Sequence, residues 1–358
     1  MPASPMSASP LRYLHPGWFT LVMGWAGLSL AWWRAAPLMG GLARWMGLLA
    51  GVVAAALFVG VAMVSVWRAL RQRDAWRDDL LHPVRHAFVA AIPVSMILLA
   101  TVIAGIAPAL SRGLLAIDGQ TWAISASTAG HWMLVAELLW MTGALALLWV
   151  TAWVLTRWWR AGRPLAGVTP VHLIPIVGHV LTPLAGVQIG HGDWAAGQFL
   201  LGLLLWPWWV SLMWRRRHQG PPLPERLAPT RFIQLAPLAV IGLSTSVLGL
   251  GLWVAALTWL LGLALLVVLW REMGAMLQGM PFGLPHWGLS FPLAAWSSLT
   301  WLMALDPALH PVQGVAQVLA VSVLAVVTLV ILALSSATIK GVRSGQLLVP
   351  EPTPGPAR

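Results

Sequence analysis

Residues 82–100 read HPVRHAFVAAIPVSMILLA, an apolar stretch that opens with His-Pro and carries a second proline, Pro93, inside it. Four other apolar segments also open with a proline and carry a second helix breaker, a proline or a glycine. Each of the five is followed by an uninterrupted Leu-, Ala- and Trp-rich segment. A helix breaker inside a bilayer is tolerated only where protein or a water-filled cavity satisfies the freed backbone groups. The alternation therefore predicts interrupted helices around a central pathway, inside a jacket of smoother ones. The interrupted segments are His15-Pro16 with Gly24, His82-Pro83 with Pro93, Thr169-Pro170 with Pro175 and Pro183, Ala228-Pro229 with Pro237, and Pro285-His286 with Pro292.

The composition is that of an integral membrane protein. Only 9% of the 358 residues are charged and 59% are hydrophobic, and apolar runs longer than about 18 residues recur along the chain. We predict one membrane domain over residues 15–345, with residues 1–14 and 346–358 as disordered tails. Its ten expected spans are 16–35, 42–69, 84–108, 126–158, 170–190, 194–215, 230–248, 250–277, 284–304 and 311–340.

The net charge of +11 is explained by membrane topology rather than by a nucleic-acid partner. With the N-terminus inside, 18 of the 21 Lys and Arg residues fall in cytoplasmic segments. Only Arg34, Arg44 and Arg112 fall on the other side, as the positive-inside rule requires. We therefore expect a multi-pass protein of a bacterial cytoplasmic (inner) membrane, with both termini in the cytoplasm.

The interrupted and smooth spans alternate, so the repeating unit is a helical hairpin of roughly 50 to 80 residues. Three interrupted segments begin alike, with HPVRHAFVAAIP, TPVHLIP and APTRFIQLAP. Five like units can close around an axis, with the smooth helices facing lipid. The predicted fold is an all-α integral membrane protein with ten transmembrane helices, arranged as five helical hairpins around a quasi-fivefold central pore.

Five stretches, in order, resemble the odd-numbered helices of the tellurite-resistance/dicarboxylate transporter family. That family includes the bacterial TehA proteins, fungal malate transporters and the slow anion channels of plant guard cells. The resemblance implies a homotrimer with one pore per subunit, passive or proton-linked passage of small anions, and a pore closed by an aromatic ring from the ninth helix. The stretches are HPGWFTLVMGWAGLSLAWW, HPVRHAFVAAIPVSMILL, TPVHLIP, FIQLAPLAVIGLS and WGLSFPLAAWSSLTW.

The resemblance places the gate on Phe291, within Ser290-Phe291-Pro292. A large apolar ring blocks ions sterically and by dewetting. The alternative is that Phe291 is a packing residue like Phe88 or Phe282. The chain departs from the bacterial pattern in its first helix, where Val22 stands in the place of a proline. The residues expected to line the pore are Gly24, Pro93, Pro175, Gly178, Pro237 and Pro292.

Three charged residues are further candidates. Arg85 and Arg231 lie at the starts of interrupted spans, where they could attract anions into an inner vestibule or simply set the topology. Glu137 is the one acid that the sequence places deep in a span. An ionisable group in the membrane is a functional candidate by default, so Glu137 is either a proton-coupling residue or a structural hydrogen-bonding group.

The sequence leaves three functions open. The first is a TehA-like anion channel, and the second is a proton-coupled exporter of C4-dicarboxylates such as malate, or of sulfite or tellurite. The third is a membrane haem or metal enzyme, suggested by the pairs His82/His86 and His172/His179. The sequence has no cysteine and no H-E-x-x-H motif. We therefore predict a transporter without a cofactor, a metal or catalytic residues.

Overall fold

A computed structural model describes residues 10–117, 120–273 and 280–349. It is helical almost throughout; its one sheet is a short antiparallel hairpin of β1 (Leu115–Ile117) and β2 (Gln120–Trp122). Within the described ranges, eight helices are long and apolar enough to cross a membrane. They are Pro16–Arg71, Arg85–Ser111, Ala126–Arg160, Gly192–Gln219, Glu225–Val247, Leu252–Glu272, Leu284–Leu305 and Gln313–Arg343.

The first of these, α1 (Phe19–Arg71), is itself a hairpin. Its backbone leaves the helical region at Gly40 (φ 66°, ψ −144°), three residues after Pro37. The Ser29 hydroxyl donates to the Gly47 carbonyl at 2.6 Å, so the two halves pack against each other. The positive φ at Gly40 favours glycine, which allows the chain to reverse there.

A shorter apolar helical segment, Pro170–Gly186, lies where we expected the fifth span. It comprises η5 (Pro170–His172), α5 (Leu173–Leu181) and α6 (Pro183–Gly186). Thr182 between α5 and α6 keeps helical angles, so the direction of the segment is maintained.

The sequence had suggested that the second prolines kink the middle of their helices. In the structure, these prolines lie near the starts of α-helices instead. Each is the third residue of an α-helix that a 3₁₀ segment precedes. Proline has no N–H, and its ring clashes with the carbonyl four residues earlier, so the preceding turn winds more tightly. The junctions are Pro93 in α3 (Ala91–Ser111) after η3 (Arg85–Ala90), Pro175 in α5 after η5, Pro237 in α8 (Leu235–Val247) after η6 (Glu225–Gln234), and Pro292 in α10 (Ser290–Leu305) after η7 (Leu284–Leu289). The first unit repeats the junction without the proline: η2 (Pro16–Trp18) runs into α1, whose third residue is Leu21. Leu21, and not Val22 as expected, therefore stands in the place of the proline.

The helices that carry these junctions form a closed cycle of neighbours. α1 contacts α3 and α10, α3 contacts α5, α5 contacts α8, and α8 contacts α10. Four helices pack outside them: α4 (Ala126–Arg160) on α3, α7 (Gly192–Gln219) on α5, α9 (Leu252–Met273) on α8, and α11 (Gln313–Arg343) on α10. In the most apolar stretches of the spans containing α3, α8 and α10, 83%, 89% and 72% of residues are buried, against 22–33% in α4, α7, α9 and α11. The interrupted helices α3, α8 and α10 are therefore far more buried than the smooth helices that pack on them.

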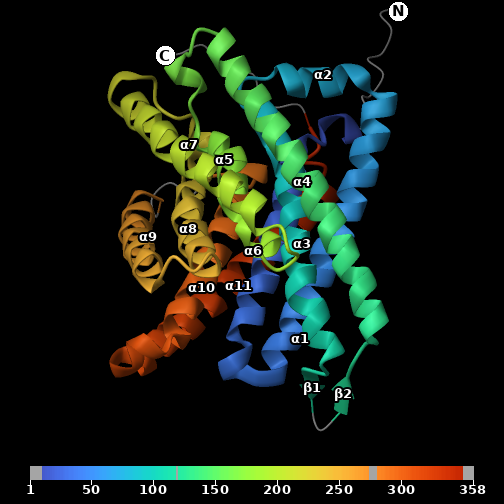
Figure 1. Cartoon of the computed structure of the whole chain (residues 1–358). Helices are drawn as coiled ribbons and strands as arrows, with labels where there is room; N and C mark the ends of the chain where they lie inside the picture. Colours follow the sequence, from blue (N-terminus) through green and yellow to red (C-terminus); the bar gives the residue numbers. More distant parts are fainter. Residues whose placement is uncertain (1–9, 118–119, 274–279, 350–358) are drawn as a thin grey trace, which may run out of the picture.

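The described chain begins and ends at the same end of the bundle. η1 (Pro10–Tyr13) meets the last turn of α1, where Arg68 Nε donates to the Arg12 carbonyl at 2.9 Å. The last turns of α11 lie beside the start of α10, where Trp287 Nε1 donates to Thr338 Oγ1 at 2.9 Å. In Figure 1, α2 (Arg73–Leu81) crosses the upper end of the bundle and the β1–β2 hairpin lies at the lower end. Of the expected tails, residues 1–9 and 350–358 lie outside the described residues.

Candidate functional site

Phe291 is the second residue of α10, directly before the junction proline Pro292. Its side chain is 5% exposed and faces α1. Gly27 on α1 makes this approach possible, because a Cβ at that position would lie 3.2 Å from Cδ2 of the ring. A glycine therefore provides the space in which the ring of Phe291 lies.

Two cavities meet at Phe291, which lines both of them. The larger, of about 230 Å³, is lined by residues of α1, α3, α5, α6, α8 and α10. The smaller, of about 20 Å³, has lining residues from α1, α5, η6, α8, η7 and α10. A space this small holds about one water molecule. Phe291 therefore lies between a roomy cavity and a narrow one.

The smaller cavity is lined in part by residues at the same position in different repeated units. In four of the five units, the second residue of the inner α-helix lines the smaller cavity: Thr20, Ile174, Ala236 and Phe291. The corresponding residue of α3, Ile92, is not part of this lining. Phe291 is the largest of these four side chains.

The larger cavity extends from Phe291 toward the carboxyl ends of the inner helices. Its wall is mostly apolar, with Thr101 and Ser298 as hydroxyl groups and Gln188 and Arg34 as polar groups further along. None of the described residues that line either cavity is an aspartate or a glutamate. The surroundings of Phe291 are therefore free of negative charge within the described part of the chain.

Of the six expected pore-lining residues, four are prolines and two are glycines, and only Pro292 lines a cavity at Phe291. Pro292 lines the smaller cavity, whereas Pro93, Pro175 and Pro237 are buried at their junctions and line neither cavity. Two glycines serve helix packing instead. A Cβ on Gly24 would lie 2.6 Å from Ser290 Oγ, and one on Gly178 would lie 2.7 Å from side-chain atoms of Leu147 and Val94. Gly24 thus allows α1 to approach α10, and Gly178 allows α5 to approach α4 and α3.

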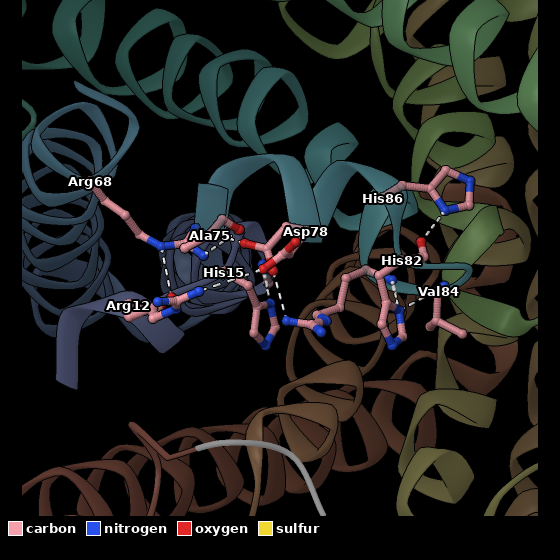
Figure 2. A network of polar contacts seen from close by, with 11 residues as sticks. Arg12, His15, Arg68, Ala75, Asp78, His82, Val84 and His86 are labelled. Atoms are coloured by element: carbon pink, nitrogen blue, oxygen red, sulfur yellow. Dashed lines mark hydrogen bonds and ion pairs between the residues drawn. The ribbon is translucent and has the colours of Figure 1, made fainter. Parts of the chain in front are cut away.

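Arg85 is part of a network of polar contacts at the end of the bundle where the chain begins. Figure 2 shows this region, with Arg12, Arg68 and Asp78 among its labelled residues. Asp79, whose side chain is fully buried, forms an ion pair with Arg68, with 2.7 Å between Oδ2 and Nη1, and accepts a hydrogen bond from Arg85 Nη1 at 2.8 Å. Burial raises the pKa of the Asp79 carboxyl, and the two guanidinium groups act in the opposite direction. Two cations against one carboxylate leave a net positive charge among these three groups when all are ionised.

Arg231 is in a similar cluster. Glu272 on α9 pairs with Arg231 at 2.9 Å and with Arg217 at 3.0 Å. These residues line a separate cavity of about 430 Å³ between α7, α9 and η6, away from Phe291. Neither arginine expected in the vestibule lines the two cavities at Phe291.

The histidines near the inner-helix starts act largely as caps. His15 Nδ1 accepts the N–H of Gly17 at 3.0 Å, and His82 Nδ1 accepts the N–H groups of Val84 and Arg85, both at 3.1 Å. Burial, with Arg85 and Arg68 nearby, lowers the pKa of His15 to about 3. His15 is therefore neutral at pH 7 and adds no positive charge there.

Glu137 on α4 forms an ion pair with His191, the residue before α7, with 2.7 Å between Oε1 and Nε2. Trp140 stacks on the imidazole at 5.5 Å. The side chain of Glu137 is 43% exposed and belongs to the lining of neither cavity at Phe291. The structure places Glu137 in a link between two outer elements rather than on the central axis.

The other histidine candidates have protein partners. His172 Nδ1 lies 3.0 Å from Thr169 Oγ1, and His179 is held between Thr151 Oγ1 at 2.9 Å and Gln198 Oε1 at 3.1 Å. In the part of the chain that the structure describes, no three His, Cys, Asp or Glu side chains are grouped so that they could hold a metal ion.

The sequence reasoning missed Gly27 and Arg34. Gly27 lies three residues after Gly24, and this spacing places both on one face of a helix, which is a usable signal. Arg34 was assigned to topology alone, although it lines the larger cavity.

Comparison with known families gives one match. Residues 13–339 match the SLAC1 family, whose description is voltage-dependent anion channel. The match covers the whole membrane region and confirms the resemblance carried by the five sequence stretches. No match was found among curated proteins.

Proposed function

This chain belongs to the SLAC1 family, and we propose that it is an anion channel whose central pore is closed by Phe291. The family and the apolar helices make it a multi-pass membrane protein of anion transport. The proposal adds the location of the pore and the identity of the gate. The path runs between α1, α3, α5, α8 and α10.

The position of Phe291 between the two cavities is the observation that carries the proposal. Removing the ring would join a space of about 230 Å³ to the narrow one lined by Thr20, Ile174 and Ala236. A narrow apolar constriction excludes ions because it cannot replace their hydration shell. A small displacement of the ring would therefore change the permeability strongly.

The repeated junctions support a ten-span architecture. Counting α1 as two spans and Pro170–Gly186 as one extends the eight long helices to ten, in five hairpins around the axis. The clusters of Arg68, Arg85, Arg217 and Arg231 mark the cytoplasmic end by the positive-inside rule. We place the protein in a bacterial inner membrane as a homotrimer with one pore per subunit.

The cavities favour a channel over a proton-coupled carrier. A carrier needs a site near the midplane that binds its substrate and coupling ion. The described linings of the two cavities contain no carboxylate and no histidine that could carry a coupling proton. Small anions such as chloride and nitrate are the substrates proposed here, and tellurite or sulfite resistance would follow from the same permeability.

Conductance tests the proposal. We expect the purified Phe291→Ala variant in planar bilayers to carry an anion current at least about tenfold larger than wild type, because the steric block is gone. Phe88→Ala is the matched control, since Phe88 is buried in η3 against His15 and lines neither cavity. Equal currents from Phe291→Ala and wild type, at matched incorporation, would refute the gate.

A further inference from the structure

The larger cavity is lined in part by a positively charged side chain. Arg34, in the first half of α1, lines it together with Gln188 and Thr101. Because the cavity extends from Phe291 toward the carboxyl ends of the inner helices, Arg34 lies on the side of Phe291 away from the arginine clusters. An ionisable side chain at membrane depth is costly and marks ion pathways more often than packing.

Arg34 has no counter-charge among the described residues: it forms no ion pair or hydrogen bond with any of them. The arginines at the other end differ. Arg68 and Arg85 share Asp79, and Arg217 and Arg231 share Glu272. The charge of Arg34 is therefore open to the contents of the cavity.

Gln188 occupies the equivalent position of another repeat. Leu21 is the third residue of α1, and Pro175 is the third residue of α5. Arg34 follows Leu21 by the same number of residues as Gln188 follows Pro175. One amide hydrogen of Gln188 is donated to the Leu184 carbonyl at 2.7 Å, which holds the side chain in place. The second amide hydrogen of Gln188 and the five N–H groups of the Arg34 guanidinium remain as donors, beside the amide oxygen of Gln188, which is an acceptor. A fork of donors without a carboxylate matches a halide or a planar oxyanion.

We propose that Arg34 is an anion-binding residue, which holds one small anion such as chloride or nitrate in the larger cavity, between Phe291 and the outer mouth. This inference rests on the proposed channel function. It gives the larger cavity an electropositive region on the side of Phe291 away from the arginine clusters. A positive charge in a cavity with low-dielectric walls concentrates anions and disfavours cations. Arg34 would thus set anion selectivity, whereas Phe291 sets opening.

The absence of cysteine from the sequence allows a chemical test. Arg34→Cys is made in the Phe291→Ala background and recorded in planar bilayers with thiosulfonate reagents. We expect the anion conductance at 10 mM salt to fall at least about threefold and the difference to shrink at 1 M, where the Debye length is about 3 Å. Attaching a trimethylammonium group should restore the conductance and the anion preference, and attaching a sulfonate group should not.

Arg44→Cys in the same background is the control. Arg44 is a partly buried cation on the second half of α1, and it donates to the Leu114 carbonyl instead of lining the cavity. Its labelling should leave the selectivity unchanged. Arg34→Lys, which keeps the charge, should retain most of the conductance, and this separates loss of charge from misfolding.

The two proposals fail differently. If Phe291→Ala carries no anion current, the gated channel itself is refuted. If Phe291→Ala conducts and Arg34→Cys shows the same conductance and reversal potential before and after either reagent, only the anion site at Arg34 is overturned.

Discussion

The ring of Phe291 faces Gly27 so closely that a Cβ on Gly27 would lie 3.2 Å from Cδ2. The same Cβ would lie 3.0 Å from the Cβ of Ala294, one turn further along α10. The absence of a side chain at Gly27 therefore sets where the ring can lie, and the position of the gate depends on two helices rather than one.

Gly27→Ala should destabilise the closed position of the ring, because the added methyl group crowds both Phe291 and Ala294. Overpacking of this kind costs about 1–3 kcal/mol. We expect a basal anion current above wild type and below that of Phe291→Ala. Gly105→Ala is the control, since Gly105 lines the same cavity with open space around its Cβ position. Equal currents from the two alanine variants would show that the Gly27 contact does not position the ring.

Gly24→Ala should weaken the packing of α1 on α10. The new Cβ would lie 2.6 Å from Ser290 Oγ, so the helices must separate, at a cost of about 1–3 kcal/mol. A lower melting temperature in detergent is the expected result. Gly60→Ala, where the Cβ position has no neighbour within 4 Å, should instead be neutral or stabilising. Unchanged melting of Gly24→Ala would contradict the close approach.

Asp79→Asn should destabilise the protein strongly, because the neutral amide removes the buried carboxylate with which both Arg68 and Arg85 pair. Breaking a buried ion pair from one side costs about 3–5 kcal/mol. Thermal unfolding in detergent measures the loss. Asp78→Asn is the control, because Asp78 is exposed and 3.9 Å from Arg12. If both variants melt alike, the Asp79 network is not a major source of stability.

His15 should make stability depend on pH. The pKa of His15 is lowered to about 3 in the folded chain, against an ordinary value of 6.5. The unfolded chain therefore binds more protons between these values, so stability is full above about pH 6.5 and falls as pH drops toward 3. His15→Asn, which keeps a side-chain acceptor for Gly17 N–H, should have a shallower dependence of melting temperature on pH. An identical slope would show that His15 does not contribute.

Glu137→Gln should leave both the anion current and its pH dependence unchanged, because the Glu137–His191 pair lies away from the two cavities. The loss of a half-exposed ion pair costs at most about 1 kcal/mol. Currents recorded between pH 5 and 8 test this. If the pH dependence disappears in Glu137→Gln, the proton-coupling reading of Glu137 replaces the structural one.

The sequence predicted the layers of the fold better than the geometry of each helix. The proline at the start of each interrupted segment, and the uninterrupted apolar segment that follows it, sufficed to place the interrupted helices inside. The junction at Pro93 was misread as a mid-helix kink because Arg85–Ala90, which precede it, are also compatible with an α-helix. Only the tertiary structure shows that this stretch winds as a 3₁₀ segment.

The site was partly predictable. Phe291 came from family resemblance, but its partner Gly27 depends on the rotation of α1 about its own axis, which composition does not fix. The depth of Glu137 could not be fixed from the sequence, because α4 has 35 residues, about 52 Å, and exceeds the roughly 30 Å of a hydrocarbon core. Arg34 was counted only toward topology, because charge counting ignores which way a side chain points.

The most direct test of the central claim is the accessibility of a single cysteine at Ser298, which lines the larger cavity. A membrane-impermeant thiosulfonate reagent is applied to oriented proteoliposomes from either side. The account predicts that Ser298→Cys reacts only from the Arg34 side when Phe291 is present, and from both sides when Phe291→Ala is added. Reaction from both sides with Phe291 intact, or from one side only without it, would contradict the claim that this ring separates the two cavities.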